Sequence, residues 1–176
     1  WSQRKGLLFV GGFRHPPNVD AVLWFAREVF PRIRATQPSL GFDCVGGDVP
    51  PEIAQLADIP GVRIHGHVPD LQPLLDGARV SIAPLRYGAG VKGKVNQAMA
   101  HGLPVVATSA AVEGMHLRDG EDVLVADDAA AFADAVRRLH GDDALWSRLS
   151  ANGRDNVARH FSLDAARAVV RELFFD

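Results

Sequence analysis

Short apolar segments alternate with amphipathic ones along the chain, and this alternation constrains the fold more than any other feature. The apolar segments do not alternate apolar with polar residues, as half-exposed strands do. Continuous apolar segments are typical of parallel strands that are covered on both faces of the sheet. We therefore predict an α/β fold: a single doubly wound domain, residues 1–176, with a mainly parallel sheet of about six strands and helices on both faces. The strands are expected at residues 7–12, 42–47, 62–66, 79–85, 103–108 and 122–126.

Helices are expected between these strands and after the last one. The first begins with Asn18 as N-cap, continues with apolar residues at helical spacing as far as Ile33, and is kinked or ended by Pro31. Trp24 lies beside its apolar stripe and is expected in the core or in a domain contact. Further helices are expected at residues 51–57, 71–77, 93–102, 128–139, 142–161 and 162–175, with Asp127 or Asp128 and Ser162 as N-caps.

Composition narrows the classes of function. The chain has 176 residues, 47% of them hydrophobic, and a net charge of −2, which gives no general attraction to nucleic acid or to an anionic membrane. The single Cys44 has no disulfide partner and is expected to be buried. No apolar run is long enough to span a membrane. Because the chain starts without Met, directly before a strand, we expect it to be a piece of a longer protein.

Three clusters of glycine follow predicted strands. Parallel strands place their carboxyl ends at one edge of the sheet, where such folds bind ligands. Gly46 and Gly47 are expected to serve a tight strand exit rather than a ligand. The third cluster differs, because a helix begins directly after it and Lys92 and Lys94 lie within it. The clusters are Gly11 and Gly12; Gly46 and Gly47; and Gly88, Gly90 and Gly93.

The third cluster predicts a local anion site. The run GAGVKGK (88–94) lacks the spacing and the Ser or Thr of a Walker motif, and no G-x-G-x-x-G opens the first helix. The first strand ends without the acidic cluster of a receiver domain. A nucleoside diphosphate held by backbone amides and a lysine, without a metal, fits the residues better.

At this point the sequence resembles a known family. FVGGFRHPPNVDAVLWF (9–25), residues 64–108 and residues 113–136 resemble the carboxyl-terminal half of retaining glycosyltransferases of the group 1 (family 4) type. The most specific run is AMAHGLPVVAT (98–108). The resemblance covers nearly the whole chain and implies the GT-B architecture, in which two Rossmann-like domains face each other and the second binds a nucleotide-sugar donor. The amino-terminal acceptor domain would then be absent from this chain.

The resemblance also implies donor-binding residues. Gln97 stands where the family has a ribose-binding Glu, and its amide can both donate and accept a hydrogen bond. Glu113 is either a contact to the donor sugar or an acid at a helix N-terminus. The diphosphate is expected at Gly11, Gly12, Gly90, Val91, Lys92 and Gly93, and the base near His67, Val68 and Leu71.

Several positions depart from the family pattern. Gly12 and the PPN segment (16–18) replace the usual Arg and Lys, and Ala89 replaces a Glu. Arg14 lies nearby and is expected among the donor-binding residues, and we expect an exposed Lys92 to supply the missing charge. Arg86 either orders its loop or contacts the donor, and His101 suits a helix C-terminus. His65 and His67 are expected to lack carboxylate partners and to bind no metal.

The sequence thus predicts the donor half of a retaining glycosyltransferase that uses a UDP- or GDP-sugar, with no metal and no other cofactor. The expected partners are the small-molecule donor and the protein's own amino-terminal domain. We expect a cytoplasmic protein whose membrane contact, if any, is made at the inner face through that domain. Alternatives are a non-catalytic nucleotide-sugar-binding module and half of a GT-B sugar-nucleotide epimerase. We expect this chain alone to transfer no sugar, and Phe174 or Phe175 to be partly exposed or in contact with another copy.

Overall fold

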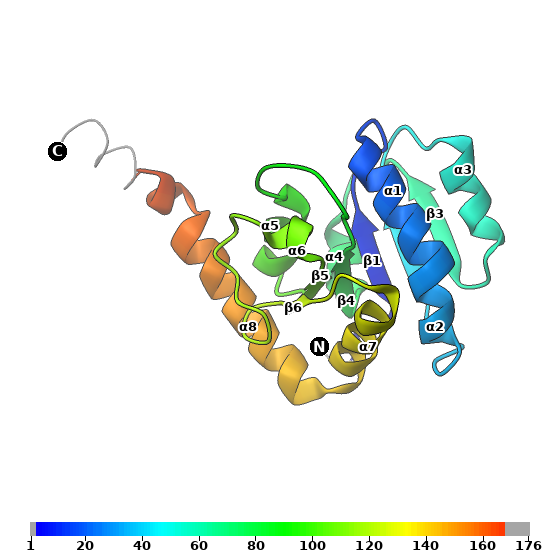
Figure 1. The fold of residues 1–176 in the computed structure, drawn as a ribbon. Coiled ribbons are helices and arrows are strands. Elements are labelled where there is room, and N and C mark those ends of the chain that lie inside the picture. Colours follow the sequence, from blue (N-terminus) through cyan, green and yellow to red (C-terminus); the bar gives the residue numbers. More distant parts are fainter. Residues whose placement is uncertain (1–2, 168–176) are drawn as a thin grey trace.

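Six short apolar segments form one parallel sheet in the computed structural model, which describes residues 3–167 (Figure 1). Neighbouring strands pair in parallel, in the spatial order β3-β2-β1-β4-β5-β6. The chain therefore leaves β1 in one direction along the sheet, and after β3 it returns to β1's other side. The strands are β1 (Leu7–Val10), β2 (Phe42–Val45), β3 (Val62–Gly66), β4 (Val80–Ala83), β5 (Val105–Ala107) and β6 (Leu124–Val125).

Helices cover both faces of this sheet, as the sequence predicted. On one face α7 packs against α2 and η1, and on the other α5 packs against α8 (Figure 1). The doubly wound α/β prediction is confirmed. The helices are α1 (Pro16–Trp24), the π-helical η1 (Phe25–Val29), α2 (Phe30–Arg34), α3 (Pro51–Ala54), the 3-10 helix η2 (Gln55–Asp58), α4 (Gln72–Gly77), α5 (Gly93–Ala100), α6 (Ser109–Val112), α7 (Ala129–Gly141) and α8 (Asp143–His160).

An aromatic cluster fills the core between the sheet and the α1–α2 layer. The ring of Phe25 lies 4.9 Å from that of Phe42 and 5.9 Å from that of Phe132, both in edge-to-face geometry. Trp24 is 6% exposed and also packs edge-on against Phe132, so its predicted place in the core is confirmed. Cys44 is buried as expected.

The first helix begins earlier than the sequence suggested. Asn18 is not its N-cap, because the helix starts at Pro16 with His15 in the cap position. Proline at the first helical positions has a suitable φ and loses only an amide that would be unbonded there. The side chain of Asn18 is therefore free for other contacts, described below.

Pro31 does not end the first helical segment. The helical segment continues to Arg34, and the five residues of η1 adopt π-helical bonding just before the proline. Since Pro31 has no amide for the carbonyl one turn earlier, a local change to wider bonding lets the helix continue.

The predicted caps later in the chain are largely confirmed. Asp128 caps α7 through the amides of Ala130 and Ala131, whereas Asp127 binds the amide and hydroxyl of Ser109 at the start of α6, a helix that the sequence did not suggest. The hydroxyl of Ser162 accepts from the amide of Ala165. The prediction for Phe174 and Phe175 lies outside the described residues.

Candidate functional site

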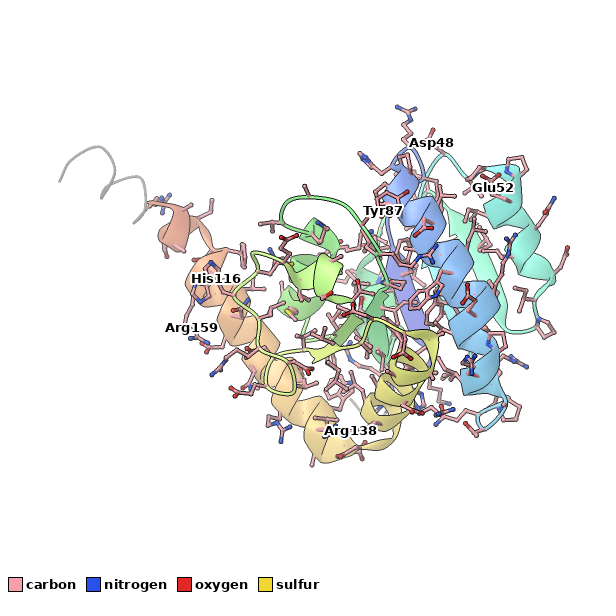
Figure 2. All side chains as sticks on the ribbon, in the orientation of Figure 1. Asp48, Glu52, Tyr87, His116, Arg138 and Arg159 are labelled. Atoms are coloured by element: carbon pink, nitrogen blue, oxygen red, sulfur yellow. The ribbon has the colours of Figure 1, made fainter. Side chains whose placement is uncertain are left out.

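The carboxyl ends of β1 and β4 lie side by side, because these two strands pair in the sheet. Strand order reverses at this pair, and ligands of open α/β sheets bind at such a switch point. Gly11 and Gly12 follow β1, and the loop at 84–92 leads from β4 into α5. Figure 2 shows Asp48, after β2, and Tyr87, after β4, at this end of the molecule, and Arg138 of α7 at the opposite end. The sheet thus brings together the glycine clusters that the sequence singled out.

Two of these glycines allow other parts of the chain to approach the backbone closely at this edge of the sheet. A Cβ on Gly46 would lie 2.0 Å from the carbonyl oxygen of Gly11, so only glycine fits there without a backbone shift. A Cβ on Gly11 would lie 2.7 Å from Nζ of Lys94. By contrast, a Cβ on Gly47 would meet nothing closer than 3.7 Å. Gly46 is therefore explained by packing.

The loop after β4 uses glycine for its backbone conformation. Gly88 and Gly90 have φ of 122° and 79°, values that other residues rarely adopt. A Cβ on Gly12 or Gly93 would meet no atom within 4 Å, so both positions face open space. Gly93 is the first residue of α5, whose first amides have no partner within the helix.

The prediction that Lys92 is exposed is wrong. Its side chain is turned inward, and Nζ donates to the carbonyl oxygens of Gly90 at 2.6 Å and Gly88 at 3.0 Å. The residue is only 8% exposed. Lys92 therefore braces the turn of its own loop. The sequence could not show this, because the contacts depend on the positive φ of the two glycines.

Lys94 lies in the first turn of α5, and its side chain reaches toward α1 and β1. Its Nζ donates to Oδ1 of Asn18 and lies 4.4 Å from the centre of the Phe9 ring. The amide nitrogen of Asn18 in turn donates to the carbonyl oxygen of Gly12 at 2.7 Å. Burial lowers the pKa of Lys94 to about 8, with a further contribution from the charge of Lys92. Asn18 was not predicted as a candidate site residue, because its place before the apolar stripe of the first helix suggested an N-cap.

Adjoining cavities line this edge. One of about 380 Å³ is bordered by residues on both sides of the switch point, including Asn18, Val91, Lys92, Gly93 and Lys94. Another, of about 360 Å³, is bordered by Gly11, Gly12, His67, Val68 and Leu71. A third, of about 310 Å³, shares Val68 and Leu71 and adds Gln97 and His101. Most residues expected for diphosphate, base and ribose thus border one of these three cavities, whereas Gly90 borders none of them.

Two arginines lie outside these cavities. Arg14 is exposed and pairs with Asp48 at 3.0 Å. Arg86 forms a two-pronged ion pair with Asp20 of α1. The pair fixes the loop after β4 to the first helix, which favours the loop-ordering interpretation of Arg86.

Glu113 lies apart from the switch point. It follows α6 and borders a cavity of about 460 Å³ with Ser109, Ala110, Val112 and Val125. The alternative of an acid at a helix N-terminus is wrong, because Glu113 is at the helix's C-terminal cap. Nearby, His116 has a φ of 55°, and its ring stacks on that of His160 at 4.4 Å.

The expectation that His65 lacks a carboxylate partner is wrong. Its Nε2 lies 2.6 Å from Oδ1 of Asp43, which also pairs with Arg63. Burial alone would raise the pKa of Asp43, but the bonds and charges of these two partners hold it below its usual range. Within residues 3–167, no group of three or more His, Cys, Asp or Glu side chains could hold a metal ion.

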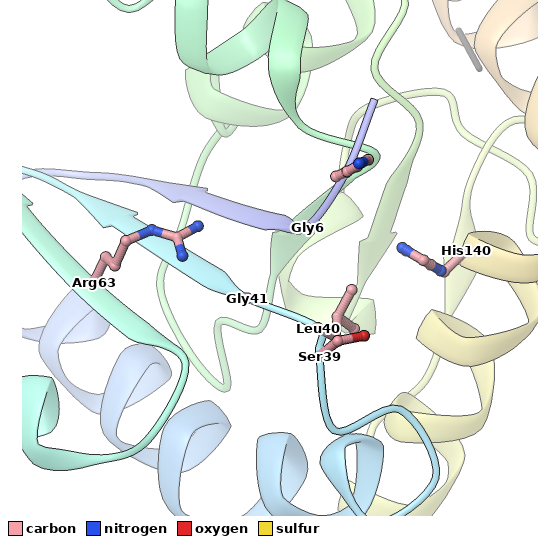
Figure 3. A pocket seen from close by; sticks show the side chains of 7 residues that line it. Gly6, Ser39, Leu40, Gly41, Arg63 and His140 are labelled. Atoms are coloured by element: carbon pink, nitrogen blue, oxygen red, sulfur yellow. The ribbon is translucent and has the colours of Figure 1, made fainter. Parts of the chain in front are cut away.

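A cavity of about 560 Å³ lies at the other edge of the sheet, where β1 and β2 begin (Figure 3). Gly6, Gly41 and Arg63 border it, together with Ser39 and His140. Since ligands of open α/β sheets bind at the carboxyl ends of strands, this cavity is not the candidate site.

Comparison with known proteins identifies the family of the chain. A family model described as glycosyl transferases group 1 matches residues 4–142. The chain belongs to the group 1 glycosyl transferases. This group 1 chain is 30% identical over 106 residues to the lipopolysaccharide core biosynthesis glycosyltransferase LpsE of Rhizobium meliloti, covering 59% of the chain and 31% of LpsE. It is 29% identical over 138 residues to an uncharacterized 44.6 kDa protein in the cps region of Klebsiella pneumoniae, covering 74% of the chain and 36% of that protein.

Solved structures show the same fold for this group 1 chain. S. aureus TarM, solved in complex with UDP among other ligands, matches with a TM-score of 0.80 at 17% identity, covering 99% of the chain and 36% of TarM. Anabaena HepE, in complex with UDP and glucose, matches with a TM-score of 0.77 at 14% identity, covering 98% of the chain and 48% of HepE. The chain thus spans about a third of the curated relatives and less than half of these two solved proteins. In the described part of the chain, no helix is long and apolar enough to cross a membrane.

Proposed function

We propose that this chain is the donor-binding half of a retaining glycosyltransferase that uses a UDP- or GDP-linked sugar. The observation that carries this most strongly is the convergence of the glycine clusters at the β1–β4 switch point, beside cavities that Gln97, His67, Val68 and Leu71 also border. Retention of anomeric configuration is part of this proposal, and the resemblance to the family supports it. The UDP bound to TarM and HepE makes uridine nucleotides the first to test.

Each part of the donor has a matching surface in this proposal. The open backbone at Gly12 and Gly93 lets a diphosphate approach the amides of α5 without meeting a side chain. Val68 and Leu71 offer apolar surface for the base, and Gln97 is exposed at the cavity that they share. We propose that backbone amides and a lysine neutralise the diphosphate, with no metal and no other cofactor.

A thermal-shift screen tests the proposal. A ligand that binds only the native state, at a hundred times its Kd, stabilises it by about 2.7 kcal/mol. UDP or GDP, alone or linked to a sugar, should raise the melting temperature, whereas CMP serves as a nucleotide control without a diphosphate. If no nucleoside diphosphate raises it, the proposed function is wrong.

A further inference from the structure

The switch point holds a positive charge that the protein itself does not balance. Lys94 is partly buried, and Nζ donates to a neutral amide oxygen, from Asn18, and lies over the face of the Phe9 ring. Within the described residues, none of the ion pairs of the structure includes Lys94. A charge removed from water without a counter-ion is costly. This cost falls when an anion enters the cavity that Lys94 borders.

Lys92 does not compete for this role. Its Nζ is already hydrogen-bonded to the carbonyl oxygens of Gly88 and Gly90, and its side chain is buried against its own loop. Arg14 is exposed and paired with Asp48. Lys92 and Lys94 both border the cavity between β1 and β4, but Nζ of Lys92 has two carbonyl acceptors in its own loop, whereas Nζ of Lys94 has one amide oxygen as its acceptor.

We propose that Lys94 is the cation that binds the diphosphate of the donor, in place of the basic residues missing after the first strand, and that Asn18 positions it. This inference rests on the proposed function. Asn18 links Nζ of Lys94 to the carbonyl oxygen of Gly12, so that the ammonium group and the open backbone after β1 face one ligand. Lys92 then shapes the loop, and its charge acts at longer range.

The position of Lys94 also predicts a pH dependence of binding. Its pKa lies at about 8 in the ligand-free protein, so the ammonium form is lost between pH 7 and 9. Two titratable neighbours act on it: the Cys44 thiol, whose pKa burial raises to about 12, and Lys92, while His15 borders the same cavity. An anion that prefers the ammonium form should bind about tenfold more weakly at pH 9 than at pH 7.

Titration calorimetry with UDP and with GDP, at pH 7 and at pH 9, tests this inference. Lys94→Gln removes the charge and keeps a polar side chain; Lys92→Gln, at the N-cap of α5, is the matched control. At pH 7, Lys94→Gln should bind roughly 10- to 100-fold more weakly than the parent and should lose the pH dependence. Lys92→Gln should lose less affinity and stay pH-dependent, with the profile moved to higher pH because the charge of Lys92 lowers the pKa of Lys94.

The outcomes separate this inference from the proposed function. If the parent binds UDP or GDP and Lys94→Gln binds equally well, Lys94 is not the cation. If the parent binds neither nucleotide, the proposed function fails and this inference fails with it. Circular dichroism checks that each variant folds. Should Lys94→Gln not fold, the pH profiles of the parent and of Lys92→Gln decide, because a flat profile in both contradicts the role of Lys94.

Discussion

Glycines at the carboxyl edge have two roles, which are to allow a close backbone contact and to leave space open. Single substitutions distinguish these roles. Gly46 lets β2 pass the backbone of Gly11, while Gly12 and Gly93 leave space open. Clustered glycines in a sequence indicate a close approach, but they do not say whether the approaching group is a ligand or another part of the chain. For Gly46 the structure supplies the answer, since the nearest atom is a carbonyl oxygen of the protein itself.

Gly46→Ala should therefore destabilise the fold. Its Cβ would lie 2.0 Å from the oxygen of Gly11, so the backbone must shift, and overpacking of this kind costs about 1–3 kcal/mol. Gly47→Ala is the matched control, since its nearest neighbour would be 3.7 Å away, and its change should stay within about 0.5 kcal/mol. Urea denaturation measures both free energies of unfolding. Equal values for the two variants would contradict the close approach.

Lys92, at the end of the glycine-rich loop, and Lys94, in the first turn of α5, look alike in sequence and differ in the structure. Helical spacing alone could not show that Lys92 turns back to its loop carbonyls while Lys94 reaches across to α1. That difference depends on Asn18, whose place in α1 was itself wrongly predicted. Contacts between side chains on separate elements are decided by the fold, so the cluster of site residues was predictable but the division of roles within it was not.

Lys94 makes a prediction about stability that needs no ligand. Its pKa is lowered to about 8 in the folded protein, against about 10.4 when unfolded, so between these values the unfolded chain binds more protons. The free energy of unfolding should then gain a contribution that rises with pH across this window. Cys44 contributes in the opposite direction, because burial raises the pKa of its thiol.

Comparing the parent with Lys94→Gln isolates this contribution, since Cys44 is present in both. Urea denaturation at pH 7.5 and at pH 10 should show a rise in parent stability relative to the variant. A constant difference between the two proteins would contradict the lowered pKa of Lys94.

Helices and strands followed the sequence closely where hydrophobic periodicity was strong. The six strands and the helices α1, α5, α7 and α8 appear near their expected positions. Short elements were less predictable: α6 spans four residues, and its start is fixed by Asp127, which lies beyond β6. The π-helical turn of η1 depends on how a proline is accommodated within a buried helix, and apolar spacing carries no information about that.

The N-cap of α7 is a feature that a single substitution can test. Oδ1 of Asp128 accepts from the amides of Ala130 and Ala131, at 3.0 and 2.9 Å. Asp128→Ala should lower the free energy of unfolding by about 0.5–2 kcal/mol. The control is Asp134→Ala in the same helix, which removes only an exposed pair with Arg137 and should cost no more than about 0.5 kcal/mol. A smaller loss from Asp128→Ala than from the control would contradict the cap.

The order of strands in the complete sheet explains why the candidate site lies at one edge. The order β3-β2-β1-β4-β5-β6 reverses between β1 and β4, and the chain places glycine after both of these strands. Alternation of apolar and amphipathic segments was sufficient to predict this architecture, because it reflects burial of the sheet on both faces. The donor's identity is not predictable in the same way, since it depends on a few contacts in the cavities.

The chain by itself should bind donor but transfer no sugar. Transfer needs donor and acceptor held in register, and the chain matches only part of each relative's length. Incubation with a radiolabelled UDP- or GDP-sugar and a panel of acceptors measures this, with hydrolysis of the donor followed separately. Acceptor-dependent transfer by the chain alone would contradict the prediction.

Amide chemical-shift mapping during titration with UDP or GDP tests most directly whether the carboxyl edge is the nucleotide site. The amides that move should cluster at residues 11–12, 46–47, 66–71 and 88–97, around the cavities at the ends of β1 and β4. Amides at the opposite edge, around Gly6 and Gly41 (Figure 3), should stay in place. Shifts that cluster at Gly6 and Gly41, or no shifts at saturating nucleotide, would contradict the assignment.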